Sequence, residues 1–386
     1  MTTPFFDVIV VGGGIVGLSA AIAMSQRNFS VALVDAGSLA VNTDEIDARV
    51  YAINQASQAL LQQLGVWTHL AAARVSPYHH MHVWDAVNGA KIDFDARMMG
   101  CDRLGSIIEE SVMKQALLSA VATENMTRLP QCRITEVQPN AEGIAISDGR
   151  NRWQTKLLMV ADGATSATRT LLDVSLTSWP YHQQAIVATV QTEKSHQQTA
   201  HQVFNPDGPL AFLPLADTHQ CSIVGSTTTT HAKQLMSLSD EDFSAAITKA
   251  FATKLGACKV LGTRHQFPLH MRHADRYIGP GWLLMGDAAH TIHPLAGLGL
   301  NLGLADLAAW LKLLDRNKKQ GWSNIMLGAY QRQRKFEVWQ MIALMDALKT
   351  IFANPLSPIA KLRGLGIKAC DNLLPLKRLL VAHAAG

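Results

Sequence analysis

The sequence predicts an α/β protein of mixed architecture, in which a discontinuous domain with a parallel sheet carries an inserted antiparallel β-sheet domain and a C-terminal helical segment. Three observations support this. A glycine-rich turn follows a buried strand within residues 7–24. Two more buried strands end in turns of glycine and aspartate, near residues 162 and 286. In between, the segment 183–266 contains stretches of alternating apolar and polar side chains, a pattern typical of β-strands.

The first element is a strand, turn and helix at the N-terminus. The apolar run 7–11 is typical of a strand buried on both faces of a parallel sheet. The turn that follows, Gly12-Gly13-Gly14-Ile15-Val16-Gly17, has the spacing GxGxxG and leads into a helix at 18–24. Gly12 makes the tight turn, Gly14 lets a pyrophosphate approach the backbone, and Gly17 lets helix and strand pack closely. The helix N-terminus then offers free N–H groups to the phosphates.

The second strand, 31–34, ends at Asp35. This acid follows the glycines by about twenty residues, where a carboxylate can hold ribose hydroxyls. A glycine-rich turn without a ligand is the alternative, but strand, helix and acid together favour a dinucleotide. NAD and FAD both remain open at this point.

The third element is a buried strand that ends in the turn Ala161-Asp162-Gly163. Ser166 and Arg169 follow it and lie three residues apart, so they share a helix face. Taken alone, the pattern also fits a simple Asp-Gly turn before a capped helix.

The fourth element is a buried strand that delivers Gly286-Asp287 to its carboxyl end, where open α/β sheets bind ligands. Asp287 is placed to bond the ribityl chain of a flavin. The glycine-rich segment 297–303 then opens a helix, whose dipole could stabilise negative charge on the N1/C2 side of a reduced flavin. Close helix packing is the alternative reading of these glycines. Because the motifs lie far apart in sequence, the domain that binds FAD must be discontinuous.

The inserted segment and the C-terminus complete the fold. Residues 185–190 and 221–224 show β patterning, and Phe212 and Leu213 are candidates either for a substrate pocket or for the core. After residue 330, apolar side chains recur at helical spacing. The tail 356–380 is apolar with interspersed lysine and arginine, which fits a partner helix, a core role or a membrane surface.

Bulk composition restricts the function. The 386 residues carry a net charge of only +4, without basic runs, so no nucleic-acid partner is expected. The five cysteines are far apart, which indicates neither a metal site nor a disulfide framework. The N-terminus resembles no signal peptide, and no apolar stretch approaches the roughly 18 residues of a membrane span. We therefore expect a cytoplasmic chain, or one that is peripheral on the inner membrane face.

The three motifs together resemble the class A flavoprotein aromatic hydroxylases, the para-hydroxybenzoate hydroxylase superfamily. The resemblance spans nearly the whole chain. Within the superfamily, the segments 49–54, 64–67, 104–105, 208–215 and 290–297 are similar to the ubiquinone-biosynthesis hydroxylases. The resemblance implies a Rossmann-like FAD-binding domain formed by residues 1–72, 102–180 and 267–335. It implies a substrate domain formed by 73–101 and 181–266, followed by the helical segment 336–386.

The resemblance also implies roles for individual residues. His293 and Pro294 lie by the flavin edge, with His293 either moving protons or serving as a satisfied neighbour of the site. Phe212 and Leu213 face the substrate. The residues implied at FAD are Gly12, Gly14, Ile15, Val16, Gly17, Asp35, Ala36, Arg49, Val50, Glu110, Val137, Ala161, Asp162, Gly163, Gly286, Asp287, Pro294, Gly297, Leu298, Gly299, Leu300 and Asn301.

The implied chemistry is hydroxylation of an apolar phenol, such as a polyprenylated quinone precursor. NAD(P)H reduces FAD, O₂ forms a flavin C4a-hydroperoxide, and its distal oxygen passes to the ring, so no side-chain nucleophile or metal is needed. The chain has one GxGxxG, which fits a class whose nicotinamide cofactor lacks its own Rossmann domain. Rival functions are hydroxylation of a small soluble aromatic, reduction of isoprenoid double bonds, and a catalytically quiet FAD-binding scaffold. A homo-oligomer or a biosynthetic complex is compatible with all of these.

Three positions depart from the family pattern. Leu298 stands where glutamine is expected, Gly225 where tryptophan is expected, and Glu110 where asparagine is usual. The turn backbone is preserved, so FAD binding stays the prediction. The departures bear on which substrate is used and which ring position is hydroxylated.

Overall fold

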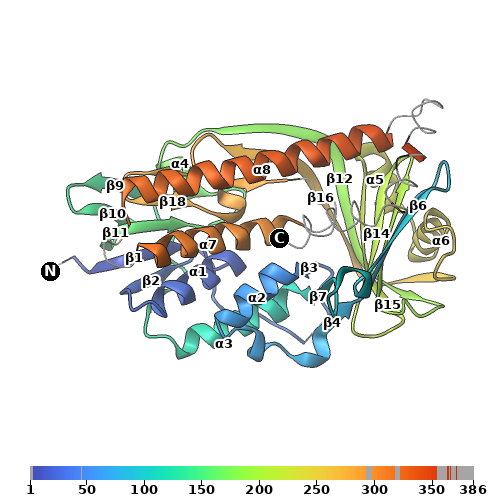
Figure 1. The fold of residues 1–386 in the computed structure, drawn as a ribbon, viewed down its shortest axis with the longest axis horizontal. Coiled ribbons are helices and arrows are strands. Elements are labelled where there is room, and N and C mark those ends of the chain that lie inside the picture. Colours follow the sequence, from blue (N-terminus) through green and yellow to red (C-terminus); the bar gives the residue numbers. More distant parts are fainter. Residues whose placement is uncertain are drawn as a thin grey trace.

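The computed structural model describes residues 3–44, 46–292, 298–317 and 322–353, together with Arg363, Gly364, Gly366 and Asp371. These residues form three sheets. In Figure 1 the first sheet lies on the side of β1 and β2, and the second sheet lies on the side of β14 and β15. The fold is the predicted α/β architecture, with a parallel sheet interrupted in sequence by a largely antiparallel one. The helices are α1 (Ile15–Ser25), α2 (Gln55–Gln63), α3 (Glu110–Thr123), α4 (Ala167–Leu171), α5 (Thr229–Ser237), α6 (Asp240–Ala250), α7 (Leu298–Arg316) and α8 (Asn324–Ala353).

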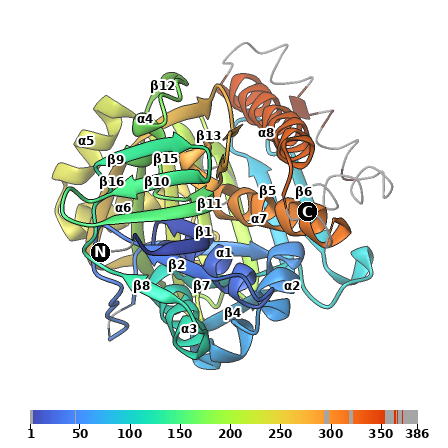
Figure 2. The ribbon, with the colours of Figure 1, turned by 90° about the vertical axis from the view of Figure 1, so that its left-hand side faces the viewer.

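The first sheet is the expected parallel one. Its main path runs β17-β18-β11-β1-β2-β8, and the pairs from β18 to β8 are parallel. A hairpin, β9 and β10, pairs antiparallel with β11. The strands are β1 (Phe5–Val11), β2 (Val31–Val34), β8 (Thr127–Leu129), β9 (Glu136–Asn140), β10 (Gly143–Ser147), β11 (Arg152–Val160), β17 (Ile278–Gly279) and β18 (Trp282–Leu284). The segments that carry the three motifs therefore follow the carboxyl ends of three adjacent parallel strands, β1, β11 and β18. Figure 2 shows β1 beside β11.

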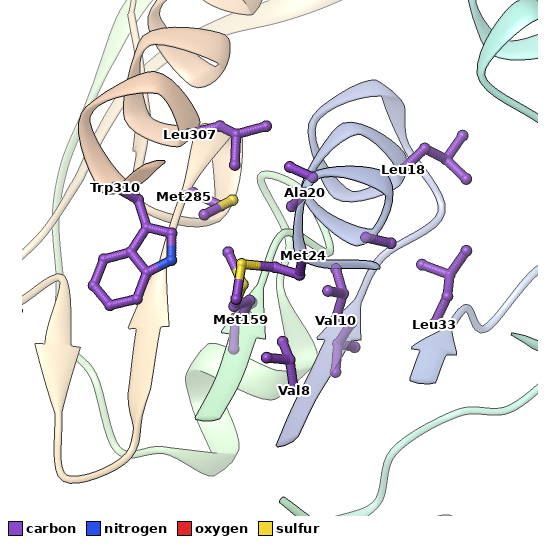
Figure 3. Close-up of a cluster of buried hydrophobic side chains, with 14 of the residues drawn as sticks. Val8, Val10, Leu18, Ala20, Met24, Leu33, Met159, Met285, Leu307 and Trp310 are labelled. Atoms are coloured by element: carbon purple, nitrogen blue, oxygen red, sulfur yellow. The ribbon is translucent and has the colours of Figure 1, made fainter. Parts of the chain in front are cut away.

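Helix α1 covers this sheet and contacts both α3 and α7. Its buried positions are mostly small, so neighbouring elements approach closely: Ala20, Ala21 and Ala23 are completely buried. Figure 3 shows Val8 and Val10 of β1, Met159 of β11 and Trp310 of α7 in the same apolar cluster. Burial of this sheet on both faces explains why its strands are continuous apolar runs.

The second sheet has the order β19-β16-β12-β15-β14-β13-β5-β6 and is antiparallel except for the pair β13 and β5. That pair is parallel because β5 comes from an earlier part of the chain and not from a hairpin with β13. Helices α5 and α6 pack on one face, over a cluster that includes Phe212 and Phe251. The strands are β5 (His80–Asp85), β6 (Lys91–Asp95), β12 (Leu176–Thr192), β13 (Thr199–Asn205), β14 (Gly208–Pro214), β15 (Gln220–Thr228), β16 (Cys258–Ala274) and β19 (His290–Thr291).

A small third sheet of three antiparallel strands lies between the other two sheets in Figure 1. Its order is β3 (Val50–Asn54), β7 (Gly105–Glu109) and β4 (Val75–Tyr78). Short 3₁₀ turns complete the described elements at η1 (Trp67–His69), η2 (Ala72–Arg74), η3 (Arg97–Met99) and η4 (Gly286–Ala288).

Helix α8 connects the two halves of the molecule and runs along its length in Figure 1. Its first turns pack against α7 and β17, and its later side chains Val338, Met341 and Met345 pack against the second sheet. The predicted boundary at 335/336 falls inside this continuous 30-residue helix, just as the predicted boundaries at 180/181 and 266/267 fall inside the strands β12 and β16. In the described part of the chain, no helix has the length and apolar character that crossing a membrane requires.

Candidate cofactor and active site

The glycines of the first turn fall into two groups by what surrounds them. A Cβ atom added at Gly12 would lie 2.3 Å from the carbonyl oxygen of Ala161, and one at Gly17 would lie 1.9 Å from that of Gly12. These two positions are glycine because backbone packs against backbone. A Cβ at Gly14 meets nothing within 4 Å, although this residue is the N-cap of α1. Open space above a helix N-terminus is what an approaching phosphate requires.

Asp35 lies at the end of β2 and contacts the same turn. Its carboxylate accepts hydrogen bonds from the N–H of Gly13 at 2.5 Å and from the N–H of Gly37 at 2.8 Å. The acid therefore fixes the glycine turn, at the position where this motif places a ribose-binding carboxylate.

A cleft of about 410 Å³ lies over these residues. It is lined by Val11, Gly12, Gly13, Gly14, Asp35, Ala36, Cys132, Arg133, Ile134, Ala161, Asp162, Gly163, Thr165, Ala167 and Thr168. Besides Gly12 and Gly14, five of the predicted cofactor residues line this one cleft: Asp35, Ala36, Ala161, Asp162 and Gly163. The first and second motifs therefore form a single site.

Asp162 carries the clearest sign that this cleft takes a polar ligand. One carboxylate oxygen accepts from the N–H of Thr168 at 3.1 Å, while Oδ1 is buried and has no hydrogen-bond partner among the described residues. Buried acceptors are nearly always paired, so a ligand donor is expected there. Gly163, at a φ of +86°, leaves open space where a Cβ would stand. An unpaired acceptor beside two open glycines fits a dinucleotide.

The third motif contacts both of the others. A Cβ at Gly303 would lie 2.8 Å from Val16 of the first turn and 3.1 Å from the Cα of Gly286. Arg169, which is buried, donates to the carbonyl oxygens of Ala288 at 2.9 Å and Ala164 at 3.3 Å. Its guanidinium thus ties the turn after Asp162 to the turn around Asp287.

Asp287 has a cationic environment. The residue is exposed at the surface of the chain. The protein around its carboxyl group nevertheless displaces part of the hydrating water, and this desolvation raises the pKa of the carboxyl above its usual value. His290, Arg49 and Arg272 lie near and favour the charged form, but desolvation outweighs them. Hydroxyl donors of a ribityl chain would replace the lost water around this carboxylate.

Arg49 and Glu110 form one side of this environment. Their side chains make an ion pair at 3.4 Å, and the Arg49 guanidinium lies 5.3 Å from the centre of the Tyr51 ring. Burial raises the pKa of the Tyr51 hydroxyl, which also interacts with Glu110. The departure at position 110 therefore places a carboxylate beside the predicted cofactor arginine.

The start of α7 includes the predicted residues Gly299, Leu300 and Asn301. Among the described atoms, none lies within 4 Å of a Cβ added at Gly299, whereas Leu300 packs against the core. The Asn301 side chain donates to the carbonyl of Ala52 at 2.7 Å and accepts from the N–H of Asn54 at 3.1 Å. Asn301 thus joins the helix to β3. His293, Pro294 and Gly297 lie outside the described residues, as does the side chain of Leu298.

The structure places the other predicted cofactor residues as follows. Ile15 is buried in the core at the start of α1, and Val50 is half-buried on β3. Val137 is half-buried on β9 and packs against the core, while the neighbouring residues 132–134 line the cleft. Their roles at FAD stay predictions.

The two predicted substrate residues point to opposite faces of β14. Phe212 is fully buried and stacks on Phe251 at 3.7 Å between ring centres, on the face that α6 covers. Leu213 is half-buried and pairs with Ser222, whose hydroxyl donates to the carbonyl of Ala48 at 3.2 Å. Since paired residues share a face, Leu213 lies on the face toward the loop that carries Arg49. Phe212 is a core residue in this arrangement.

The sequence did not indicate several side chains of the site. Arg272 lies near both Asp287 and Arg169, while Asp306 and Arg334 form a buried ion pair behind the turn. Nothing in their local sequence distinguishes them from surface charges on a helix or strand. A partial signal exists for Asp306, because a single acid within the apolar face of a helix needs a buried partner.

Comparisons with known proteins agree with this geometry. A family model described as "FAD binding domain" matches residues 6–344. The chain is 35% identical over 393 residues to a 3-demethoxyubiquinol 3-hydroxylase of Escherichia coli (strain K12), covering all of both chains. It is 33% identical over 441 residues to the human "Ubiquinone biosynthesis monooxygenase COQ6, mitochondrial", covering 100% of this chain and 93% of that protein. A p-nitrophenol 4-monooxygenase of Pseudomonas putida DLL-E4 has the same fold, with a TM-score of 0.80 at 17% identity, covering 99% of this chain and 98% of the other.

Fold and site together define an FAD-dependent hydroxylase of the flavoprotein aromatic hydroxylase class. Within that class, the chain belongs to the family of ubiquinone-biosynthesis hydroxylases. The predicted cofactor, FAD, is thereby confirmed.

Proposed function

We propose that this chain hydroxylates a polyprenylated phenol or a related quinone precursor, with NAD(P)H as reductant and O₂ as co-substrate. The observation that carries the proposal is the meeting of three distant motifs, two of which line one cleft while the third packs against both, in a chain that matches a 3-demethoxyubiquinol 3-hydroxylase over its whole length. Bound and reduced FAD would supply the activation of oxygen.

The residues of the chain bind and orient the cofactor. The open position at Gly14 and the N-terminus of α1 receive the pyrophosphate, with Asp35 at the ribose. Asp162 offers its unpaired Oδ1 to a ligand donor, and Asp287 accepts from the ribityl hydroxyls. All four contributions come from residues positioned by sheet ends or helix starts, so the site is rigid.

The second sheet provides an apolar surface for the substrate. Leu213, Ala211 and Val224 lie on the face turned away from α6, and all three are half-buried. The hydrogen bond from Ser222 to Ala48 directs this face toward the Arg49 loop. An apolar surface there would position a phenol ring and its prenyl chain and would exclude water from the reacting centre.

A membrane surface is the source we propose for such a substrate, with the chain attached peripherally from the cytoplasmic side. The proposal rests on the apolar character of a prenylated phenol. Self-association, or assembly into a biosynthetic complex, stays a prediction.

Product analysis tests the proposed function. The purified FAD-bound protein is incubated with NAD(P)H, ¹⁸O₂ and a polyprenylphenol in detergent. We expect one ¹⁸O atom in the ring product and phenol-stimulated oxidation of NAD(P)H. A reduced product without ¹⁸O would indicate reduction of isoprenoid double bonds, and turnover only of water-soluble phenols would indicate the small-aromatic hydroxylase. No stimulation by any phenol would favour the scaffold.

Cells that lack the gene provide the second test. They should accumulate the quinone precursor that the enzyme consumes, and this compound identifies the ring position. A normal quinone content in such cells would contradict a role in this biosynthesis.

A further inference from the structure

A buried ion network lies directly behind the turn that presents Asp287. At its centre is Asp306 of α7, which is fully buried, and the side chains of His290 and Arg334 are each only 2% exposed. Arg334 comes from α8, and its Nε donates to Oδ1 of Asp306 at 2.6 Å. The guanidinium also contacts Glu337 and donates to the carbonyl of Leu302 at 3.2 Å. Such a cluster is expensive to bury, so a specific role is expected.

The network holds the backbone on both sides of Asp287. Oδ2 of Asp306 accepts from the N–H of Gly286 at 2.8 Å and from Nε2 of His290 at 2.7 Å. Residue 286 begins the 3₁₀ turn η4 (Gly286–Ala288), and residue 290 begins β19 two positions after this turn ends. One carboxylate oxygen therefore holds the start of the turn and the strand that follows it.

Arg334 keeps this carboxylate charged. Burial alone would raise the pKa of Asp306, but His290 and Arg334 outweigh it, and the pKa lies below its usual value. An ionised carboxylate only accepts hydrogen bonds, so Nε2 of His290 is the donor. Nε2 of His290 and the N–H of Gly286 are therefore both held by a carboxylate whose charge Arg334 of α8 stabilises.

We propose that Asp306 and Arg334 are positioning residues that fix the Asp287 turn and set the reduction potential of bound FAD. Reduction places negative charge on a flavin, and buried charges near it act through a medium that screens them weakly. Asp306 and Arg334 form a pair of opposite charges beside the turn, so removing Arg334 makes this environment more negative and removing Asp306 makes it more positive. The inference rests on FAD binding and needs no assumption about the phenol.

The test compares Arg334→Met, Asp306→Asn and the double variant with the wild-type holoenzyme. We expect each single variant to bind FAD about tenfold to a hundredfold more weakly, because a buried group loses its partner. Reduction potentials should shift in opposite directions: downward in Arg334→Met, which leaves a negative charge, and upward in Asp306→Asn, which leaves a positive one. The double variant should return near the wild-type potential. Potentials are measured by dye equilibration under anaerobic conditions, and affinities by titration of the apoprotein with FAD.

Asp315→Asn is the matched control, since Asp315 lies on the same helix and pairs with Arg27 at 2.9 Å near the surface. It should change neither quantity. Lower melting temperatures with unchanged reduction potentials would show that Asp306 and Arg334 have a purely structural role, which would overturn the proposal. Potentials that shift in the same direction in Arg334→Met and Asp306→Asn would overturn it equally. If Arg334→Met does not fold, Arg334→Lys replaces it, because lysine keeps the positive charge. The reduction potential of FAD bound to Arg334→Lys must then stay close to the wild-type value, while that of FAD bound to Asp306→Asn is still shifted upward. None of these measurements requires oxygen or a phenol. A negative result would therefore contradict this proposal without bearing on the proposed hydroxylation.

Discussion

The two ends of the cofactor site are built by different means. The nucleotide end consists of backbone and empty space: Gly14 and Gly163 leave room, and Asp162 leaves an acceptor unpaired. The flavin end consists of charged side chains, with Asp287 among His290, Arg49 and Arg272 and a filled ion network behind it. The first end selects by shape, whereas the second sets an electrostatic environment. Changes at the nucleotide end should therefore alter binding alone, and changes at the flavin end should also alter pH dependence.

The largest expected effect is at Gly14. Gly14→Val places a side chain in the space where pyrophosphate is expected, and FAD affinity should fall by about a hundredfold. The apoprotein should keep its melting temperature, because nothing lies within 4 Å of the new Cβ. Gly17→Ala is the contrasting variant: its Cβ would meet the Gly12 carbonyl oxygen at 1.9 Å, so the apoprotein itself should lose stability. Thermal melting with and without FAD distinguishes the two. Equal loss of stability in both would contradict the assignment of Gly14 to the ligand.

A smaller effect is expected at Asp162. In Asp162→Asn the amide oxygen can still accept from the N–H of Thr168, which turns the NH₂ group toward the ligand donor. FAD should bind about tenfold more weakly, by isothermal titration, while the potential of bound FAD stays unchanged. A shift in the reduction potential of FAD bound to Asp162→Asn would contradict the claim that the nucleotide end affects binding alone.

Asp287→Asn tests the flavin end through pH. Since the pKa of Asp287 is raised in the folded chain, the folded apoprotein holds this proton more tightly than the unfolded chain does. The contribution of Asp287 to the free energy of unfolding therefore falls as pH rises above about 4. Asp287→Asn has no such proton, so its free energy of unfolding should not show this contribution. Asp306 contributes with opposite sign, because its lowered pKa gives stability that is lost as pH falls. Urea titrations between about pH 4 and 7 measure the contribution of Asp287, and titrations below about pH 4 measure that of Asp306. A difference between wild type and variant that does not change with pH would contradict the raised pKa.

The smallest effect is expected outside both ends. Leu213→Ser should raise KM for an apolar phenol about threefold to tenfold, with unchanged FAD affinity and potential. Phe212→Leu should instead lower the free energy of unfolding by about 1–2 kcal/mol through the lost stacking on Phe251, without a change in KM. Steady-state kinetics and chemical denaturation of both variants check this. An unchanged KM in Leu213→Ser would place the substrate elsewhere.

The sequence predicted the nucleotide end better than the flavin end. Glycines before a helix and an acid after a buried strand have local patterns, so the turn at Gly12 and the acid at Asp35 could be located from spacing alone. The pattern at Asp162 also fitted a simple Asp-Gly turn and became specific only together with the other motifs. The ion network could not, because Asp306 and Arg334 lie 28 positions apart on two helices and meet only after both have packed. The strand end indicated Asp287 and the family resemblance supplied Arg49, but neither indicated the cationic neighbours that surround Asp287. In the second sheet, alternation predicted the strands but not which face of β14 is covered by α6.

The strands β12 and β16 extend this contrast to the whole molecule. Each is 17 residues long, and they pair from Leu176 with Ala274 to Thr192 with Cys258. The register shifts twice, between Pro180 and Gln184 and between Val187 and Thr189. The ribbon they form belongs to both domains, so neither domain has a complete set of hydrogen bonds without the other. We expect one cooperative melting transition for the whole chain, and no independently folding fragment when the chain is cut at residues 180 and 266.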